Sequence, residues 1–275
     1  MKKKLTIMVH CLVKNEENWI WYAINSVIDY VDKILVFDTG STDRTVEIVK
    51  SIKSSKIIIE EKGNVDRAGV TKMRQQMLER CDTDWFLILD GDEVWPKAGI
   101  KELVGEIQNA GLEKEVVVVG SWWCFGDVYH YYEEPERLRH PKAPTDLLGW
   151  KSGRAIKRIK GLHCVNLYPL DSYADKNGLN VAYWSKKRHL FLKEKYFHMS
   201  LLPRSSSRIK DKEVILRGQK TRFHRGFPFP PDTSYPEVFY LKRPSIVPSP
   251  WRRLTLTDEI KGLYFRAENL IERIK

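Results

Sequence analysis

Carboxylates follow two apolar segments in the first hundred residues of the chain. Asp38 comes directly after residues 34–37, and Asp90-Gly91-Asp92-Glu93 comes directly after residues 85–89. Such closely spaced carboxylates repel one another in a dry crevice, and a hard divalent cation shared with a polyphosphate relieves the repulsion. Gly91 lacks a side chain, so backbone and ligand can approach closely there. The pattern predicts a cation site that neutralises a leaving diphosphate.

The elements that must position these carboxylates alternate between strand and helix. Apolar runs of strand length predict strands over residues 5–13, 33–37, 56–60, 85–89 and 116–120. Apolar residues at three- and four-residue spacing predict helices over residues 17–31, 46–52, 71–80 and 100–109. Apolar strands separated by helices are typical of a mostly parallel sheet covered on both faces. Ligands bind beyond the carboxyl ends of such strands, so Asp38 and Asp92 are expected to converge.

The composition changes near residue 120. Residues 1–120 contain 17 Lys and Arg against 20 Asp and Glu, whereas the rest of the chain contains 30 against 16. The acidic half can hold a cation, and the basic half can attract an anionic partner. Residues 121–132 predict aromatic-rich strands, residues 223–251 a long ordered loop or lid, and residues 260–274 an amphipathic helix.

Cysteine usage and hydropathy suggest a cytoplasmic protein. The four cysteines form no Cys-x-x-Cys pair, so reduced, buried thiols are expected rather than zinc ligands or disulfides. The apolar run 5–13 contains His10 and is followed by no cleavage site, which favours a strand over a signal peptide. No run approaches the roughly eighteen apolar residues of a membrane span. Peripheral contact of the C-terminal helix with the inner membrane face stays open.

Three motifs together resemble the family 2 glycosyltransferases. They are Leu12-Val13-Lys14-Asn15-Glu16-Glu17, Asp38-Thr39-Gly40-Ser41-Thr42-Asp43-Arg44-Thr45 and Asp90-Gly91-Asp92-Glu93. The resemblance implies an α/β fold of GT-A type, with a mostly parallel sheet sandwiched by helices and an aromatic, basic C-terminal acceptor portion. Residues 1–120 would bind the nucleotide-sugar, and residues 121–275 would bind the acceptor. The implied enzyme is an inverting, metal-dependent glycosyltransferase of the Asp-x-Asp type.

The resemblance also implies roles for single residues. Asp92 and His198, from Tyr196-Phe197-His198-Met199-Ser200, would hold Mn²⁺ or Mg²⁺ on the donor's diphosphate. Asp38 would contact the nucleobase and Asp90 the ribose. Arg74 stands in Met73-Arg74-Gln75, where the family often has Ala-Arg-Asn. The implied nucleotide-binding residues are Val13, Asn15, Glu16, Asp38, Arg74, Asp90 and Gly91.

An inverting transferase needs a carboxylate base for the acceptor hydroxyl. Residues 154–178 resemble the family segment that carries this base, and matching Gly161-Leu162 and Gly178 assigns the catalytic role to Asp171. The histidine that accompanies the base in the family is absent, because Leu170 precedes Asp171. Asp175 and Asp146 therefore stay as alternatives.

Acceptor contacts are expected in the second half. Aromatic side chains in the predicted strands can stack on sugars or can simply form core. A basic run after the serine triplet can grip diphosphate or an anionic acceptor, or can be a solvated loop. The aromatic residues are Trp122, Trp123, Tyr129, Tyr131 and Tyr132, and the basic residues are Arg204, Arg208, Lys210 and Lys212. The acceptor classes that fit are saccharides, lipid-linked molecules and other anionic molecules.

Two other functions stay open. Asp90-Gly91-Asp92 also resembles the nucleophile motif of haloacid-dehalogenase phosphatases, in which the first aspartate attacks phosphorus. That family expects a hydroxyl residue where this chain has Val94, and it leaves Asp38 unexplained. The basic second half also suits a non-catalytic binder of nucleic acid or of another anionic surface. The acidic cluster makes nucleic acid an unfavoured partner.

Overall fold

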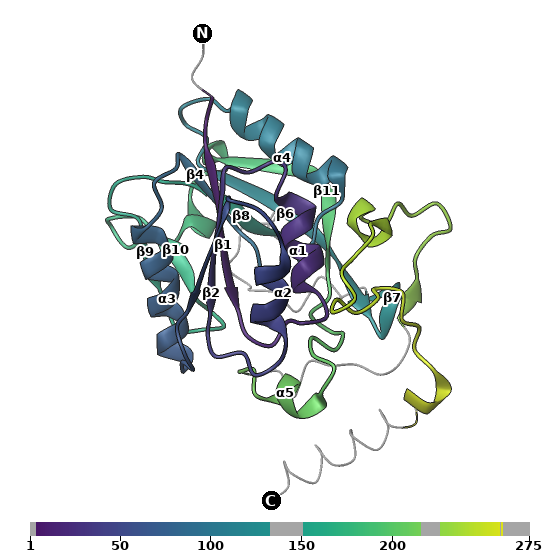
Figure 1. Cartoon of the computed structure of the whole chain (residues 1–275). Coiled ribbons are helices and arrows are strands. Elements are labelled where there is room, and N and C mark those ends of the chain that lie inside the picture. The colour runs from purple at the N-terminus through teal and green to yellow at the C-terminus, as the bar shows by residue number, and fades with distance from the viewer. Residues whose placement is uncertain (1–3, 133–150, 216–225, 259, 261–275) are drawn as a thin grey trace, which may run out of the picture.

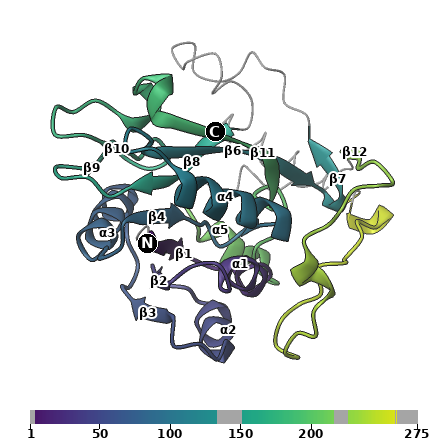
Figure 2. The ribbon, with the colours of Figure 1, turned by 90° about the horizontal axis from the view of Figure 1, so that it is seen from above.

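Four parallel strands form the N-terminal half of the sheet. The computed structural model describes residues 4–132, 151–215, 226–258 and 260. In the sheet, the parallel strands lie in the order β3-β2-β1-β4 (Figure 1; β3 is labelled in Figure 2). Their bounds are β1 (Ile7–Val13), β2 (Lys33–Asp38), β3 (Ile57–Glu61) and β4 (Trp85–Ile88). β1, β2 and β4 are almost entirely buried, as expected for continuous apolar strands covered on both faces.

The other half of the sheet is mixed in direction. β8 lies antiparallel between β4 and β6, and β6 also pairs with parallel β11 and antiparallel β7. Two short strands complete the sheet, β5 on β11 and β12 on β7. The bounds are β5 (Glu93–Val94), β6 (Val116–Phe125), β7 (Asp127–Tyr132), β8 (Lys151–Lys157), β11 (His189–His198) and β12 (Phe227–Pro228).

Helices cover both faces of the sheet. α1 (Ile20–Val27), α2 (Thr45–Ser51) and α4 (Lys97–Asn109) lie on one side, and α3 (Arg67–Glu79) lies on the other (Figure 2). The buried residues accordingly form two clusters, one under α1, α2 and α4 and one under α3. The predicted α/β architecture, a sheet between two layers of helices whose N-terminal half is parallel, is confirmed.

Several elements extend beyond their predicted bounds. α3 begins at Arg67 because the Asp66 carboxylate accepts the N–H of Gly69 at 2.7 Å and caps the helix. α4 begins at Lys97, directly after Pro96. β6 continues from the predicted strand through Phe125, so one strand crosses residue 120 and both halves of the chain share the sheet.

Irregular structure dominates the rest of the second half. β9 (His163–Val165) and β10 (Ser172–Ala174) form a small antiparallel pair, and α5 (Arg208–Lys212) is a short helix. In the predicted loop, described from residue 226, only β12 and the 3-10 turn η6 (Glu237–Tyr240) are regular. The predicted C-terminal helix lies outside the described residues except at its first position. All four cysteines are free. Within the described part of the chain, no helix has the length and apolar character needed to cross a bilayer.

The buried centre of β4 gives a direct test of the fold. Leu87 has no exposed surface, whereas Leu112 is 91% exposed. We expect Leu87→Ala to lower the free energy of unfolding by about 2–5 kcal/mol, because it leaves a cavity in the core. Leu112→Ala, the matched control, should change it by less than about 0.5 kcal/mol. Denaturant unfolding measures both values, and equal losses would contradict the assignment of β4 to the core.

Candidate active site

The loops that follow β1, β2 and β4 meet at one edge of the sheet. In the parallel register Val13 is opposite Asp38, and His10 is opposite Ile88. The backbone continues these pairings, because Thr39 N–H donates to Val13 O at 2.9 Å and Leu89 N–H donates to His10 O at 3.1 Å. The strand-end aspartates therefore emerge on the same edge, as the sequence predicts.

Gly91 joins the Asp-x-Asp turn to the loop after β1. A Cβ atom at position 91 would lie 2.8 Å from Glu16 Cγ and 3.0 Å from Val13 Cγ1. No ordinary side chain fits that space, so Gly91 permits the close packing of the two loops. Since Val13 also pairs with Asp38, a continuous series of contacts links Asp38 to the turn that carries Asp90 and Asp92.

A cavity of about 780 Å³ opens at this edge of the sheet. Its wall combines candidate residues from the loops after β1 and β4 with others from α3, β11 and the segment between β9 and β10. The candidates that line it are Val13, Glu16, Arg74, Asp90, Gly91, Asp171 and His198. Asn15, Asp38 and Asp92 are not among the lining residues. These three are buried behind the wall, with 0%, 3% and 0% of their surface exposed.

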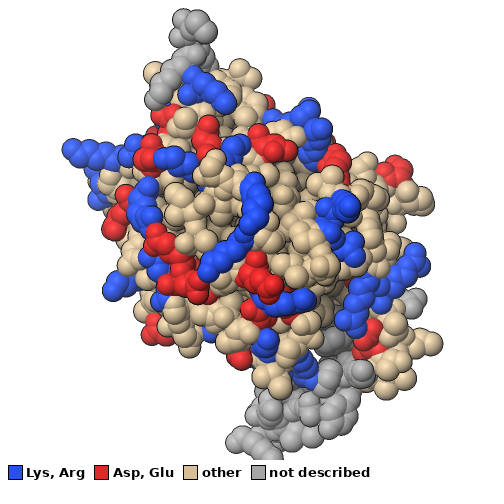
Figure 3. All heavy atoms as spheres, viewed as in Figure 1, with Lys and Arg blue, Asp and Glu red and all other residues tan. Residues whose placement is uncertain are grey.

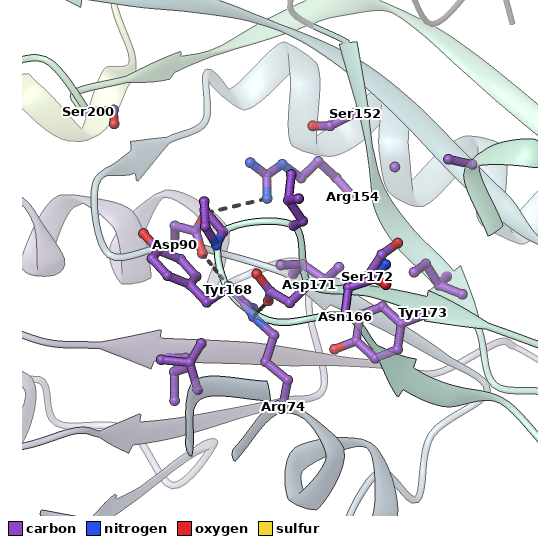
Figure 4. Close-up of a pocket in the computed structure, with 18 of the residues that line it drawn as sticks. Arg74, Asp90, Ser152, Arg154, Asn166, Tyr168, Asp171, Ser172, Tyr173 and Ser200 are labelled. Carbon is purple, nitrogen blue, oxygen red and sulfur yellow. Dashed lines mark hydrogen bonds and ion pairs between the residues drawn. The ribbon is translucent and has the colours of Figure 1, made fainter. Parts of the chain in front are cut away.

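Asp90 lies between two arginines. Arg74 Nη2 donates to Asp90 Oδ1 at 3.3 Å, and Arg154 Nη1 lies 3.6 Å from Asp90 Oδ2 (Figure 4). Burial alone would raise the pKa of Asp90, but Arg154 and Arg74 lower it below its ordinary value. The Asp90 carboxylate is thus held ionised and oriented at the cavity wall.

Each of the two arginines binds a second carboxylate. Arg74 Nε lies 2.6 Å from Asp171 Oδ2, and Arg154 forms an ion pair with Glu93. Glu93 is fully buried, and burial raises its pKa to about 8, although Arg154 opposes the shift. The contacts tie α3 and β8 to the Asp-x-Asp turn.

Asp92 faces His198 on one side and Arg204 on the other. His198 Nε2 lies 3.4 Å from Asp92 Oδ1, and Arg204 Nη2 lies 2.6 Å from Asp92 Oδ2. β11 brings His198 there, because its antiparallel pairing with β5 sets His198 opposite Glu93. Burial lowers the pKa of His198, with the Asp92 charge opposing, so its imidazole is neutral and retains a lone pair for a metal.

Asp171 reaches the cavity from the segment between β9 and β10. In Figure 4 it lies beside the guanidinium of Arg74, which also points toward Asp90. The first alternative base, Asp175, accepts the N–H groups of Asn177 and Leu179 at 2.9 and 3.2 Å and does not line the cavity. The second, Asp146, lies outside the described residues.

Asn15 and Asp38 organise the loops behind the cavity. Asn15 has a positive φ of 51°, its Oδ1 accepts Thr42 N–H at 2.8 Å, and its Nδ2 donates to Lys210 O at 2.6 Å. Asp38 Oδ2 accepts the N–H groups of Gly40 and Ser41 at 3.1 and 3.0 Å. Asp38 Oδ1 is buried and has no hydrogen-bond partner among the described residues.

The aromatic residues of β6 and β7 divide between core and cavity. Trp123 lines the cavity, and its ring lies 4.7 Å from that of His198. Trp122, by contrast, packs edge-on against Tyr131 and lies under the ammonium group of Lys195. The rings of Tyr129, Tyr131 and Tyr132 also contact other aromatic rings. Stacking on a sugar therefore remains available to Trp123.

Three residues of the cavity could not be identified as site residues from the sequence. Arg154 marked only the start of a segment, Arg204 was one of four basic residues in an apparent loop, and Tyr168 was not singled out. Tyr168 lies beside Asp90 in Figure 4. Arg154 and Arg204 keep only 12% and 13% of their side chains exposed. Burial of a charged side chain is the feature that distinguishes them, and it follows from tertiary contacts.

The excess of positive charge does not produce a uniformly basic surface on the face that holds α1 and α2. Figure 3 shows Lys and Arg intermingled with Asp and Glu on this face. Mixed charges of this kind give no continuous path for a nucleic-acid backbone there.

The amino-acid sequence of this chain is similar to those of known proteins. An uncharacterized glycosyltransferase of Rickettsia typhi is 39% identical over 93 residues, which are 34% of this chain and 29% of the relative. The lipopolysaccharide core biosynthesis glycosyltransferase LpsC of Rhizobium meliloti is 27% identical over 161 residues, which are 58% of this chain and 54% of that protein. Each alignment covers less than two thirds of the relative's own length.

A solved structure and a family model complete the comparison. The crystal structure of S. aureus TarS 1–349 in complex with UDP has a TM-score of 0.48 and 15% identity, over 71% of this chain and 60% of that chain. The model described as glycosyl transferase family 2 matches residues 9–164, more than half of the chain. Those residues run from β1 to β9 and include Asp38, Arg74, Asp90 and Asp92. The chain therefore belongs to glycosyl transferase family 2.

Proposed function

We propose that this protein is a metal-dependent, inverting glycosyltransferase that moves a sugar from a nucleotide-diphosphate donor to an acceptor hydroxyl. The observation that carries the proposal is the pair Asp92 and His198 next to a cavity whose wall presents Asp90, with arginines on both sides.

The residues around Asp92 fit a hard divalent cation. A buried carboxylate and a neutral imidazole are suitable donors for Mn²⁺, and the Nδ1 atom of His198 has no hydrogen-bond partner among the described residues. No third His, Cys, Asp or Glu joins a metal-binding group within the described part of the chain. Water and substrate phosphates commonly fill the remaining coordination positions of Mn²⁺ or Mg²⁺ in protein sites. A cation held there supplies charge stabilisation for the diphosphate leaving group.

The loops behind the cavity suit the nucleotide. Val13 and Glu16 line the cavity beside Gly91, and Asp38 offers a buried carboxylate oxygen with no hydrogen-bond partner among the described residues. A nucleobase N–H group would satisfy that oxygen, because a buried acceptor without a partner is costly. Asp90, fixed by Arg74 and Arg154, is then in position to accept hydrogen bonds from ribose hydroxyls.

Asp171 is the proposed base. The acceptor oxygen attacks the anomeric carbon, the bond from that carbon to the diphosphate oxygen breaks, and the hydroxyl proton passes to the Asp171 carboxylate. Direct displacement inverts the anomeric centre. Arg74 orients Asp171 through their 2.6 Å ion pair and connects it to Asp90. Trp123 offers a flat face for the acceptor, which we infer to be a saccharide, a lipid-linked molecule or another anionic molecule.

The phosphatase alternative fits the site poorly. A nucleophilic aspartate needs a free oxygen aimed at phosphorus, whereas Arg74 contacts one oxygen of Asp90 and Arg154 lies near the other. A non-catalytic anion binder leaves the buried carboxylates at the cavity without a role.

Asp92→Asn tests the metal site. We expect donor hydrolysis and transfer to fall at least about 100-fold, because the amide removes the charge that attracts the cation. Turnover is measured with a panel of nucleotide-sugars in Mn²⁺ and in EDTA, and circular dichroism monitors the fold. Asp82→Asn, a change of the same type at a side chain that is 60% exposed, is the control and should keep full activity. Equal turnover by Asp92→Asn and wild type, in Mn²⁺ and in EDTA, would exclude the metal role.

Asp171→Asn tests the base. We expect kcat to fall about 10²–10⁴-fold, as is typical when a general base is removed, with little change in nucleoside diphosphate affinity. Asp175→Asn is the matched control, since Asp175 serves a turn away from the cavity. Single-turnover kinetics and calorimetric binding separate the two effects. The opposite ranking of the two variants would transfer the role to Asp175.

A further inference from the structure

Arg204 bridges two carboxylates at the proposed metal site. Its Nη1 lies 2.5 Å from Glu16 Oε1 and its Nη2 lies 2.6 Å from Asp92 Oδ2. Glu16 and Asp92 have only 2% and 0% of their side chains exposed. Arg204 also lines the cavity. The proposed metal ligand thus carries a positively charged partner in this structure.

A metal ion bound at Asp92 would share one carboxylate group with Arg204. Two cations a few ångströms apart at a buried carboxylate repel each other strongly, because water does not screen them there. Arg204 contacts Oδ2 and His198 faces the other oxygen, Oδ1, so a cation bound between Asp92 and His198 would lie on the same carboxylate group as the guanidinium. Binding of the cation therefore favours a conformation in which Arg204 has left Asp92.

The backbone of Arg204 is fixed on both sides, so the exchange requires only its side chain. Asn18 N–H donates to Arg204 O at 2.9 Å, and Arg204 N–H donates to Asp211 Oδ1 at 3.1 Å. A long side chain on an anchored backbone can exchange one anion for another within the same cavity. A diphosphate suits it, because the guanidinium fork binds phosphate oxygens in a bidentate manner.

We propose that Arg204 holds Asp92 while the cation is absent, and that it moves to the donor's diphosphate when the cation takes Asp92. The inference rests on the metal-dependent function proposed above and identifies the residue that couples cation and donor binding. It gives Arg204 two effects of opposite sign. Arg204 weakens binding of the cation alone, and it strengthens binding of a nucleoside diphosphate once the cation is present. If Arg204 only stabilised the fold, it would strengthen the binding of both the cation and the nucleoside diphosphate.

Isothermal titration of Arg204→Gln tests this pair of effects. Mn²⁺ is titrated alone, and UDP is then titrated at saturating Mn²⁺. We expect Mn²⁺ to bind at least about threefold more tightly than in wild type, because the competing charge is gone. UDP should bind about tenfold or more weakly, because a charge-assisted contact to phosphate is lost. Lys101→Gln, the same charge change at an exposed residue of α4, should alter neither constant.

A second variant covers a failure of Arg204→Gln to fold, which circular dichroism would reveal. Arg204→Lys keeps the charge but not the two-pronged geometry, and it should shift both constants in the same directions by smaller factors. Weaker binding of both Mn²⁺ and UDP, or an unchanged Mn²⁺ affinity, would overturn the inference and leave the proposed function intact. Absence of Mn²⁺ and UDP binding in wild type itself would overturn both.

Discussion

The carboxylate of Asp90 lies between the guanidinium groups of Arg74 and Arg154, and this contact organises the cavity wall. Arg74 and Arg154 keep only 12% of their side chains exposed, and pairing with Asp90 compensates the cost of burying their charges, so the contact ties α3 and β8 to the Asp-x-Asp turn. Each arginine holds one further carboxylate, Asp171 or Glu93. The proposed base and the proposed ribose contact are therefore neighbours of a single guanidinium, that of Arg74. The positions of these side chains are set by ion pairs between elements that lie far apart in the sequence.

The charge balance of this cluster explains why a cation and a diphosphate suit it together. Five carboxylates, from Glu16, Asp90, Asp92, Glu93 and Asp171, contact three guanidiniums, from Arg74, Arg154 and Arg204. At neutral pH Glu93 is mostly protonated, because its pKa is raised to about 8. The other four carboxylates and the three guanidiniums then leave one net negative charge, which a divalent cation would more than neutralise. A diphosphate arriving with the cation meets an environment in which its own charge is no longer opposed. The low dielectric of the cavity strengthens each of these electrostatic interactions.

Local patterns in the sequence predicted the parallel strands and the carboxylates at their ends. β1, β2 and β4 are continuous apolar runs, and an aspartate directly after such a run is visible without any knowledge of tertiary structure. β8 was not predicted, because Lys151 to Lys157 mixes charged and small residues and pairs on both edges with strands distant in the sequence. The contact of Arg204 with Glu16 was not predicted either, because the two residues are far apart in the sequence. No periodicity distinguishes a buried arginine from a solvated one when its partner lies in another part of the chain.

The insertion of β8 between β4 and β6 also has a consequence for how the chain reaches its native state. While residues 151–157 have yet to be synthesised, the edge of β4 that will receive them has no neighbour. An open, apolar strand edge is a template for pairing with other chains, and contacts between distant segments form slowly. A nascent chain that ends after β6 thus has both carboxylate motifs but lacks β8, which joins β4 to β6 and supplies Arg154. Once β8 has emerged from the ribosome, it can cover this open edge of β4.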